Sequence, residues 1–206
     1  MTKNLKQNLL SVLVFTLGLS QILNSQSLYK INDSKDMNMK LSGTSTLHKW
    51  TMNARTFTGE AEFVFAPGNS SQLASLDYLT FSLVVKNLKS DEKKLEKNAY
   101  KALKTDQYKD ISYELKSSRV LPEKNNKYLI QTSGNLSIAG ITKLVTMDVS
   151  CVVNKNKTIT CTGSDKLKMS DYQVKPPSFM LWAMKTGDAI SLDFTMVFKK
   201  YPLDRN

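Results

Sequence analysis

Residues 55–66, RTFTGEAEFVFA, alternate between apolar and polar side chains, and this alternation decides the fold class. Phe57, Phe63 and Phe65 fall on one face of an extended chain, while threonine and glutamate side chains fall on the other. Successive side chains of a β-strand point to opposite faces of the sheet. The stretch therefore predicts a half-buried β-strand.

The same alternation recurs along the chain. Apolar residues occupy every second position in four further segments, 77–86, 111–116, 145–153 and 189–199. The pattern is shorter or weaker in segments 37–43, 128–138, 157–163 and 166–169. Strands with one apolar face are typical of antiparallel sheets. We therefore predict an all-β domain of about eight strands, arranged either as a sandwich or as a closed barrel.

Segment 90–106 has helical rather than strand periodicity. Starting at Leu95, apolar side chains recur at the spacings i, i+4, i+7 and i+8, and lysines cover the remaining faces. Ser90 or Asp91 is suited to cap the N-terminus of a helix. The segment predicts one amphipathic α-helix inserted among the strands.

The first 27 residues have the composition of a secretory signal peptide. Two lysines precede the apolar run LLSVLVFTLGLSQIL, residues 9–23, and the small residues Ser25 and Ser27 follow it. The run is short for a membrane span. We expect residues 1–27 to be removed, leaving one periplasmic or secreted domain of residues 28–206. The alternative is an uncleaved N-terminal anchor.

The 206-residue chain is strongly basic, with a formal net charge of +11. This charge suits contact with anionic membranes, anionic ligands or nucleic acid, and equally a lysine-covered soluble surface. Nucleic acid is the weakest of these partners, because the lysines are scattered and the aromatic residues form no stacking platform. The lysine-rich helix is the segment that suits peripheral contact with an anionic membrane, with a solvated face as the alternative.

Cys151 and Cys161 flank the segment VVNKNKTIT. If the two cysteines pair directly, residues 155–157 form a three-residue hairpin loop and both cysteines lie on the apolar face. In an exported protein this register favours a cross-strand disulfide, with two buried thiols as the alternative. Two thiols and one distant histidine do not complete a zinc site, so we expect no metal.

The single histidine, His48, lies in the stretch STLHKW, residues 45–50. The chain has no G-x-S-x-G motif, no His-rich metal spacing and no phosphate-binding loop, so we expect no enzymatic activity and no cofactor. Two roles for the histidine remain. With Trp50 it closes one end of a barrel, or with Ser45 and Arg55 it meets a lipid head group at a tunnel mouth.

Four blocks occur in an order that is typical of one family. They are SGTSTLHKWTMNARTFTGEAEF (42–63), FSLVVKNLKSDEKKLEKNAYKALKTDQYKDISYE (81–114), GNLSIAGITKLVTMDVSC (134–151) and KMSDYQVKPPSFMLWAMKTGDAISLDFTMVF (168–198). Together they resemble the YceI family of secreted lipid-binding proteins, over roughly residues 30–200. The last block departs from the family pattern, which more often has Phe-Gly where this chain has Tyr172 and Gln173.

The resemblance implies a lipocalin-like antiparallel β-barrel with a packed helix. It also implies a tunnel for a polyisoprenoid chain, such as a quinone or a polyprenyl phosphate, and hence a non-enzymatic protein that transports, stores or sequesters this lipid. On this fold we expect the tunnel to be lined by Phe57, Phe63, Phe65, Phe81, Leu83, Tyr113, Met147, Phe194 and Met196. The alternative is a barrel plugged by aromatic side chains, Trp182 among them, whose function lies on its surface.

Overall fold

The computed structural model describes residues 26–32, 34–179 and 184–202. Its strands are β1 (Gln26–Ile31), β2 (Asn38–Ser45), β3 (Lys49–Ala54), β4 (Thr58–Phe65), β5 (Leu73–Val84), β6 (Asp110–Pro122), β7 (Lys127–Ile138), β8 (Ile141–Val153), β9 (Ile159–Lys168), β10 (Ser178–Phe179) and β11 (Met184–Lys200). Its helical elements are the 3-10 turns η1 (Val85–Asn87) and η2 (Met169–Tyr172) and the helix α1 (Lys93–Ala102).

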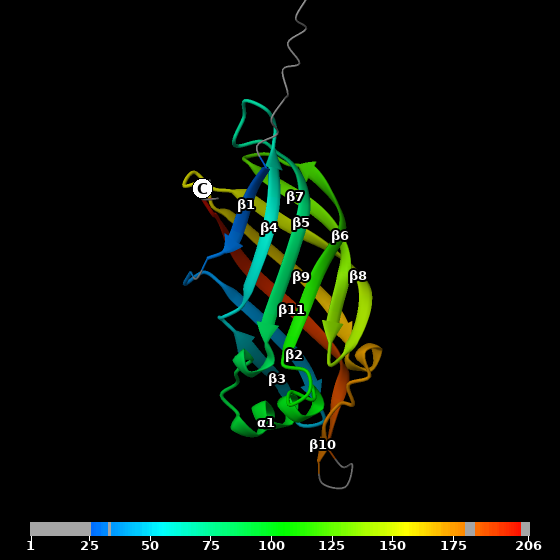
Figure 1. Ribbon diagram of the computed structural model, residues 1–206. Helices are drawn as coiled ribbons and strands as arrows, with labels where there is room; N and C mark the ends of the chain where they lie inside the picture. Colours follow the sequence, from blue (N-terminus) through cyan, green and yellow to red (C-terminus); the bar gives the residue numbers. More distant parts are fainter. Residues whose placement is uncertain (1–25, 33, 180–183, 203–206) are drawn as a thin grey trace, which may run out of the picture.

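Eight strands close into a barrel because β1 pairs with both β4 and β11 (Figure 1). The ring runs β1-β4-β5-β6-β7-β8-β9-β11 and back to β1, and each of these pairings is antiparallel. The predicted all-β, lipocalin-like antiparallel barrel with one helix is confirmed. The closure also decides between the sandwich and the barrel, which the alternating pattern left open.

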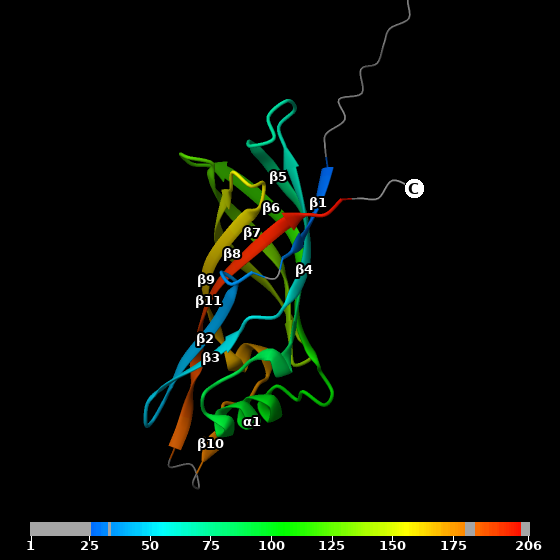
Figure 2. The same cartoon turned by 90° about the vertical axis from the view of Figure 1, so that its left-hand side faces the viewer.

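The β2–β3 hairpin continues the wall where β1 ends. β2 pairs with the N-terminal part of β11, and β3 pairs with β2. The hairpin, α1 and η2 all lie at one end of the barrel, which we call the helix end (Figure 2). The described ends of the chain, at β1 and after β11, lie at the opposite end.

The alternating segments correspond to most of the wall. The clear ones lie in β4, β5, β6, β8 and β11, and the weaker ones in β2, β7 and β9. Sequence reasoning missed β1 and β3, because it placed one at the expected cleavage site and treated the other as a turn around His48. It also divided β9 in two, although Ser164 and Asp165 stay in the ladder opposite Asp193 and Leu192 of β11.

Two expectations fall largely outside the described residues. The expected signal peptide, residues 1–27, is described only at Gln26 and Ser27, which begin β1 opposite Val64 and Phe63 of β4. Its removal therefore stays a prediction. Trp182 also lies outside the described ranges.

The helix α1 begins at Lys93, three residues later than Ser90, the first residue of the predicted segment. The expected cap at Ser90 or Asp91 is wrong, because the N-cap residue is Glu92 and no side chain makes the capping hydrogen bond. The Ser90 hydroxyl accepts a hydrogen bond from the backbone N–H of Glu92 (3.3 Å), which lies outside the helix. Instead the Glu96 carboxylate folds back and accepts hydrogen bonds from the Ser90 N–H (3.0 Å) and the Lys93 ammonium (3.0 Å). Both bonds lower the pKa of Glu96, and the bond from the Ser90 backbone has the larger effect. The negative charge lies at the positive end of the helix dipole.

The β8–β9 hairpin carries a disulfide between Cys151 and Cys161. The two cysteines are direct partners in the ladder and both are buried, as the register predicted. Pairing of β8 with β9 stops at Val149 and Gly163. Below that point β9 follows β11 alone, and η2 contacts β8, β9 and β11 at the helix end.

Candidate functional site

Two apolar cavities lie inside the barrel. The helix-end chamber has a volume of about 110 Å³ and is bounded by α1, η2 and inward side chains that include Leu41, Trp50 and Ile190. The inner chamber has a volume of about 90 Å³ and is bounded by inward side chains of the barrel strands, among them Phe81 and Phe194. The apolar face predicted for the helix forms one wall of the helix-end chamber.

The two chambers adjoin, because four strands contribute consecutive inward residues to both. The pairs, with the helix-end residue first, are Leu41 and Met39, Ile111 and Tyr113, Ile138 and Leu136, and Ile190 and Leu192. Residues i and i+2 of a strand lie about 7 Å apart on the same face. We call the joined chambers the tunnel. Along β11, from Ile190 to Phe198, it spans about 20 Å once the usual strand tilt is included.

The tunnel is hollow because three large aromatic side chains in its wall lie over glycines of a neighbouring strand. The pairs are Trp50 over Gly43, Tyr113 over Gly134 and Phe194 over Gly163. A Cβ atom at any of these glycines would overlap the ring. Each ring therefore takes the space of a missing side chain and lies along the wall, which leaves the lumen free.

An aromatic cluster of Tyr29, Phe63, Phe65 and Phe198 closes the end opposite the helix. The ring centroids of Phe63 lie 5.3 Å from Tyr29 and 5.4 Å from Phe198. At the helix end the chamber shares Asn98, Ala102 and Pro177 with a surface groove that Lys101 and Lys175 also line. The tunnel is thus blocked at the aromatic cluster and reaches the surface beside α1. We call this opening the mouth.

Most of the predicted tunnel residues line the inner chamber. They are Phe63, Phe81, Tyr113, Met147, Phe194 and Met196. Phe57, Phe65 and Leu83 line neither chamber. Phe65 belongs to the aromatic cluster, Phe57 packs on Phe81 with ring centroids 5.5 Å apart, and Leu83 is only 1% exposed. Contact of any of these residues with a ligand stays a prediction.

The predicted polar mouth is not assembled from Ser45, His48 and Arg55, because none of the three lines the tunnel. The Ser45 hydroxyl accepts a hydrogen bond from the His48 N–H (3.2 Å) and donates one to the His48 carbonyl (2.9 Å), which fixes the tip of the β2–β3 hairpin. The His48 Nε2 lies 3.2 Å from a carboxylate oxygen of Glu92, with both side chains about half exposed. Arg55 is exposed beyond the far end of β3.

Trp50, by contrast, closes part of the helix end. It is 8% exposed, lines the helix-end chamber, and donates its indole N–H to the Thr44 carbonyl (3.2 Å). Of the two roles weighed for the STLHKW stretch, this geometry supports the structural one.

Sequence reasoning missed the polar groups that face the helix-end chamber. Tyr172 lines it, and burial together with the nearby charges of Asp165 and Asp171 raises the pKa of Tyr172 to about 12. The sequence feature that could have revealed this phenol is the pair Tyr172 and Gln173, which stands where the family resemblance leads one to expect Phe-Gly. Gln173 adopts a left-handed φ of 53°, which a glycine would adopt without strain, so the turn is kept and Tyr172 adds a phenol to the wall.

Asp188 fixes η2 to β11. Its carboxylate accepts hydrogen bonds from the hydroxyl (2.6 Å) and the backbone N–H (2.8 Å) of Ser170. Both bonds lower the pKa of Asp188, and the bond from the Ser170 hydroxyl has the larger effect. The acid therefore positions the turn that carries Tyr172 at the wall of the helix-end chamber.

In the inner chamber the phenol of Tyr113 is buried at 6% exposure. Its hydroxyl has no hydrogen-bond partner within the described part of the chain. Burial raises the pKa of Tyr113, and the nearby Thr132 hydroxyl opposes that rise. An unsatisfied hydroxyl in an apolar cavity destabilises the empty barrel.

Residues 29–198 match the family model of the YceI-like domain. The chain belongs to this family. Its fold is similar to that of BcnA from Burkholderia cenocepacia, with 18% identity, a TM-score of 0.61, and 81% of this chain and 98% of that one covered. A polyisoprenoid-binding domain from Saccharophagus degradans, implicated in plant cell wall breakdown, gives 8% identity, a TM-score of 0.61 and coverage of 85% and 99%.

The YceI protein of Campylobacter jejuni has the same fold, with 17% identity, a TM-score of 0.51 and coverage of 70% of this chain and 81% of that one. No sequence among curated proteins matches the chain.

Within the described ranges, no helix is long and apolar enough to cross a membrane. The same residues contain no group of three or more His, Cys, Asp or Glu side chains placed to hold a metal ion.

We expect the Gly163→Ala substitution to narrow the inner chamber, because the new methyl group forces the Phe194 ring towards the lumen. The substitution should lower the free energy of unfolding by about 1–3 kcal/mol, which is typical of overpacking. Chemical denaturation measures this loss. The double variant Gly163→Ala/Phe194→Leu should recover part of it. Equal stability of Gly163→Ala and the wild type would contradict the wall packing described above.

Two buried tyrosines should respond oppositely to removal of their hydroxyls. Tyr128 accepts a hydrogen bond from the Leu73 N–H (3.1 Å) and donates one to the Ser71 carbonyl (2.9 Å). Tyr128→Phe should therefore destabilise the protein by about 1–3 kcal/mol, whereas Tyr113→Phe should leave the lipid-free protein as stable or more stable. Denaturation of delipidated protein checks both. A loss at Tyr113 as large as that at Tyr128 would mean that the Tyr113 hydroxyl is already bonded.

Proposed function

We propose that this protein is a non-enzymatic carrier that holds one isoprenoid lipid, a quinone or a polyprenyl phosphate, for transport, storage or sequestration. The observation that carries the proposal is the tunnel, which is apolar, blocked at one end and about 20 Å long. Burial of hydrocarbon in such a space is favourable by about 0.8 kcal/mol per methylene group. The fold shared with a domain described as polyisoprenoid-binding supports an isoprenoid as the chain.

The rival function, a filled barrel that acts through its surface, fits only the aromatic end. There Tyr29, Phe63, Phe65 and Phe198, on the adjacent strands β1, β4 and β11, pack on one another. Between this cluster and α1 the two chambers are open space. A slender ligand therefore remains the better account of the interior.

We also propose that the chain is exported to the periplasm or beyond after loss of residues 1–27. The signal-like sequence of these residues motivates the proposal. The Cys151–Cys161 disulfide supports it, because such bonds persist in oxidising compartments and are rare in the cytosol.

Native mass spectrometry of the protein purified from its own cells tests both proposals. We expect a chain that begins near Leu28 and carries a prenyl lipid in close to one-to-one amount, which solvent extraction then identifies. The Gly163→Ala variant, purified in parallel, should retain less lipid because its inner chamber is narrower. An empty wild-type protein that also refuses added quinones and polyprenyl phosphates would overturn the carrier function. A full-length chain would overturn cleavage.

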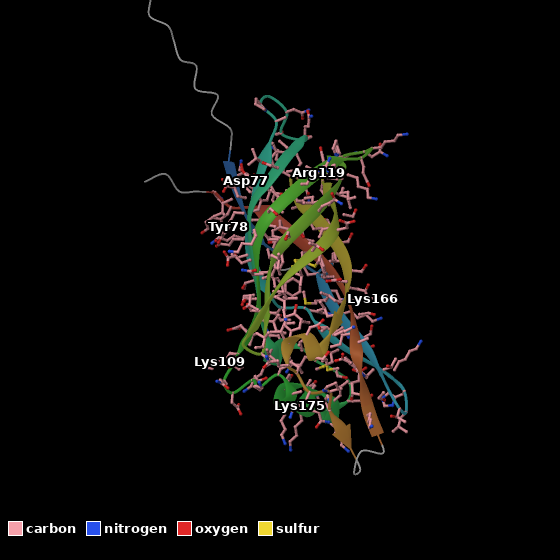
Figure 3. The ribbon with its side chains drawn as sticks, turned by 90° about the vertical axis from the view of Figure 1, so that its right-hand side faces the viewer. Asp77, Tyr78, Lys109, Arg119, Lys166 and Lys175 are labelled. Atoms are coloured by element: carbon pink, nitrogen blue, oxygen red, sulfur yellow. A yellow bond between two sulfur atoms is a disulfide. The ribbon has the colours of Figure 1, made fainter. Side chains whose placement is uncertain are left out.

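We propose that the mouth faces an anionic membrane during lipid exchange. Lys97 and Lys101 are exposed on α1, and Lys104 is exposed just after its C-terminal end. Lys175 lies on the other side of the surface groove (Figure 3). Charges of both signs occur at the opposite end, where Figure 3 labels Asp77 and Arg119. A lysine near an anionic surface contributes about 1 kcal/mol of attraction.

Vesicle co-sedimentation measures this attraction. The Lys97→Glu/Lys101→Glu/Lys104→Glu variant should lose most of its binding to phosphatidylglycerol vesicles, and added salt should release the wild type. The matched control, Lys124→Glu/Lys155→Glu/Lys199→Glu, makes the same change of net charge at the opposite end. It should lose much less binding. Equal losses in the two variants would show attraction by net charge alone and would contradict docking through the mouth.

A further inference from the structure

The Tyr113 hydroxyl is the polar group that the lipid-carrier function does not yet explain. Tyr113 lies in the middle of the tunnel wall and is only 6% exposed. Within the described ranges, its hydroxyl is the one buried side-chain N or O atom that lacks a hydrogen-bond partner. Its position is set by close packing, since its ring lies over Gly134 of the neighbouring strand. A hydrocarbon chain that fills the inner chamber leaves this hydroxyl unbonded.

Thr132 is the other polar side chain in the wall of the inner chamber. It is 5% exposed, and its hydroxyl donates to the Met147 carbonyl (3.2 Å), so its own proton is already used. The Thr132 oxygen could still accept a proton and lies near enough to lower the pKa of Tyr113, yet the two hydroxyls form no hydrogen bond within the described ranges. The Tyr113 proton is therefore left for an oxygen of a bound molecule. The wall of the inner chamber thus offers one unpaired donor to a bound molecule.

The inner chamber is not built for a charged group. The side chains that line it are aliphatic, aromatic, thioether, the disulfide, Thr132 and Tyr113, and none of them carries a charge. An ionised phosphate placed there would lose its hydration and gain no cation in return. The described lysines near the tunnel lie instead at the helix end, where Lys168 lines the helix-end chamber and Lys175 the surface groove.

We infer that the inner chamber is a subsite for a small neutral head group, one oxygen of which accepts a hydrogen bond from Tyr113. The lipid enters head first, and its prenyl tail runs through the helix-end chamber to the mouth. This inference rests on the proposed carrier function and selects within it: a quinone carbonyl or another neutral oxygen fits the subsite, and a phosphate does not. The mouth then holds hydrocarbon beside the surface from which the lipid came.

Tyr113→Phe tests the subsite, with Tyr128→Phe as the matched control that deletes a hydroxyl of the same barrel outside the tunnel wall. The probes are a geranylgeranyl benzoquinone, geranylgeranyl phosphate and a hydrocarbon of the same length. We expect Tyr113→Phe to weaken quinone binding about tenfold or more and to leave hydrocarbon binding unchanged. Tyr128→Phe should leave the quinone-to-hydrocarbon ratio as in the wild type, and the wild type should prefer the quinone to the phosphate.

Infrared difference spectra of the bound quinone give a readout that packing alone does not move. A carbonyl that accepts a hydrogen bond from Tyr113 absorbs at lower frequency in the wild type than in Tyr113→Phe. If Tyr113→Phe weakens quinone and hydrocarbon equally, or if the phosphate binds best and is indifferent to the substitution, the subsite is overturned and the carrier function stands. If the wild type binds none of the three probes, the carrier function itself fails, and the subsite with it.

Discussion

Closure of the sheet through β11 is the constraint on which the rest of the structure depends. One edge of β11 pairs with β9, and the other pairs first with β2 and then with β1. Each strand of the ring then has a partner on both sides along at least part of its length, although β8 and β9 are not paired beyond Val149 and Gly163. Closure also turns every inward face toward one common interior, which makes a tunnel possible.

A closed barrel of eight strands has an interior just wide enough for its own side chains. Whether this barrel is filled or hollow is therefore decided by where the large rings lie. At the aromatic end, Phe63 packs on Phe198 and Phe65 packs on Tyr29, and none of these rings lies over a glycine of the described residues. Further along, Phe194 and Tyr113 lie over glycines, and the lumen stays open. The two glycines under Phe194 and Tyr113 thus distinguish the open part of the interior from the aromatic end.

The sequence was informative where the deciding interactions are local. Period-two alternation located the main strands, and the Cys151–Cys161 register followed from a hairpin whose two cysteines are ten positions apart. The sequence pattern could not predict that Phe63 and Phe65 have different surroundings, because both lie on the same predicted face. Only the pairing of distant strands shows that Phe63 borders the inner chamber as well as the aromatic cluster, whereas Phe65 lies in the cluster alone. Arg55 was misplaced for the same reason, since proximity in sequence to Ser45 and His48 does not bring it to the same end of β3.

Charged and neutral polar groups lie at different places along the tunnel. The charged side chains that border the tunnel lie at the helix end, where Lys168 lines the helix-end chamber and Lys101 and Lys175 line the surface groove. Inside, the polar groups of the two chambers include two phenols, and burial raises the pKa of each, to about 12 for Tyr172. A raised phenol pKa favours the neutral form, so both groups remain protonated donors at neutral pH. In the proposed function, charge at the mouth selects the surface on which the protein docks, and neutral donors inside select the lipid.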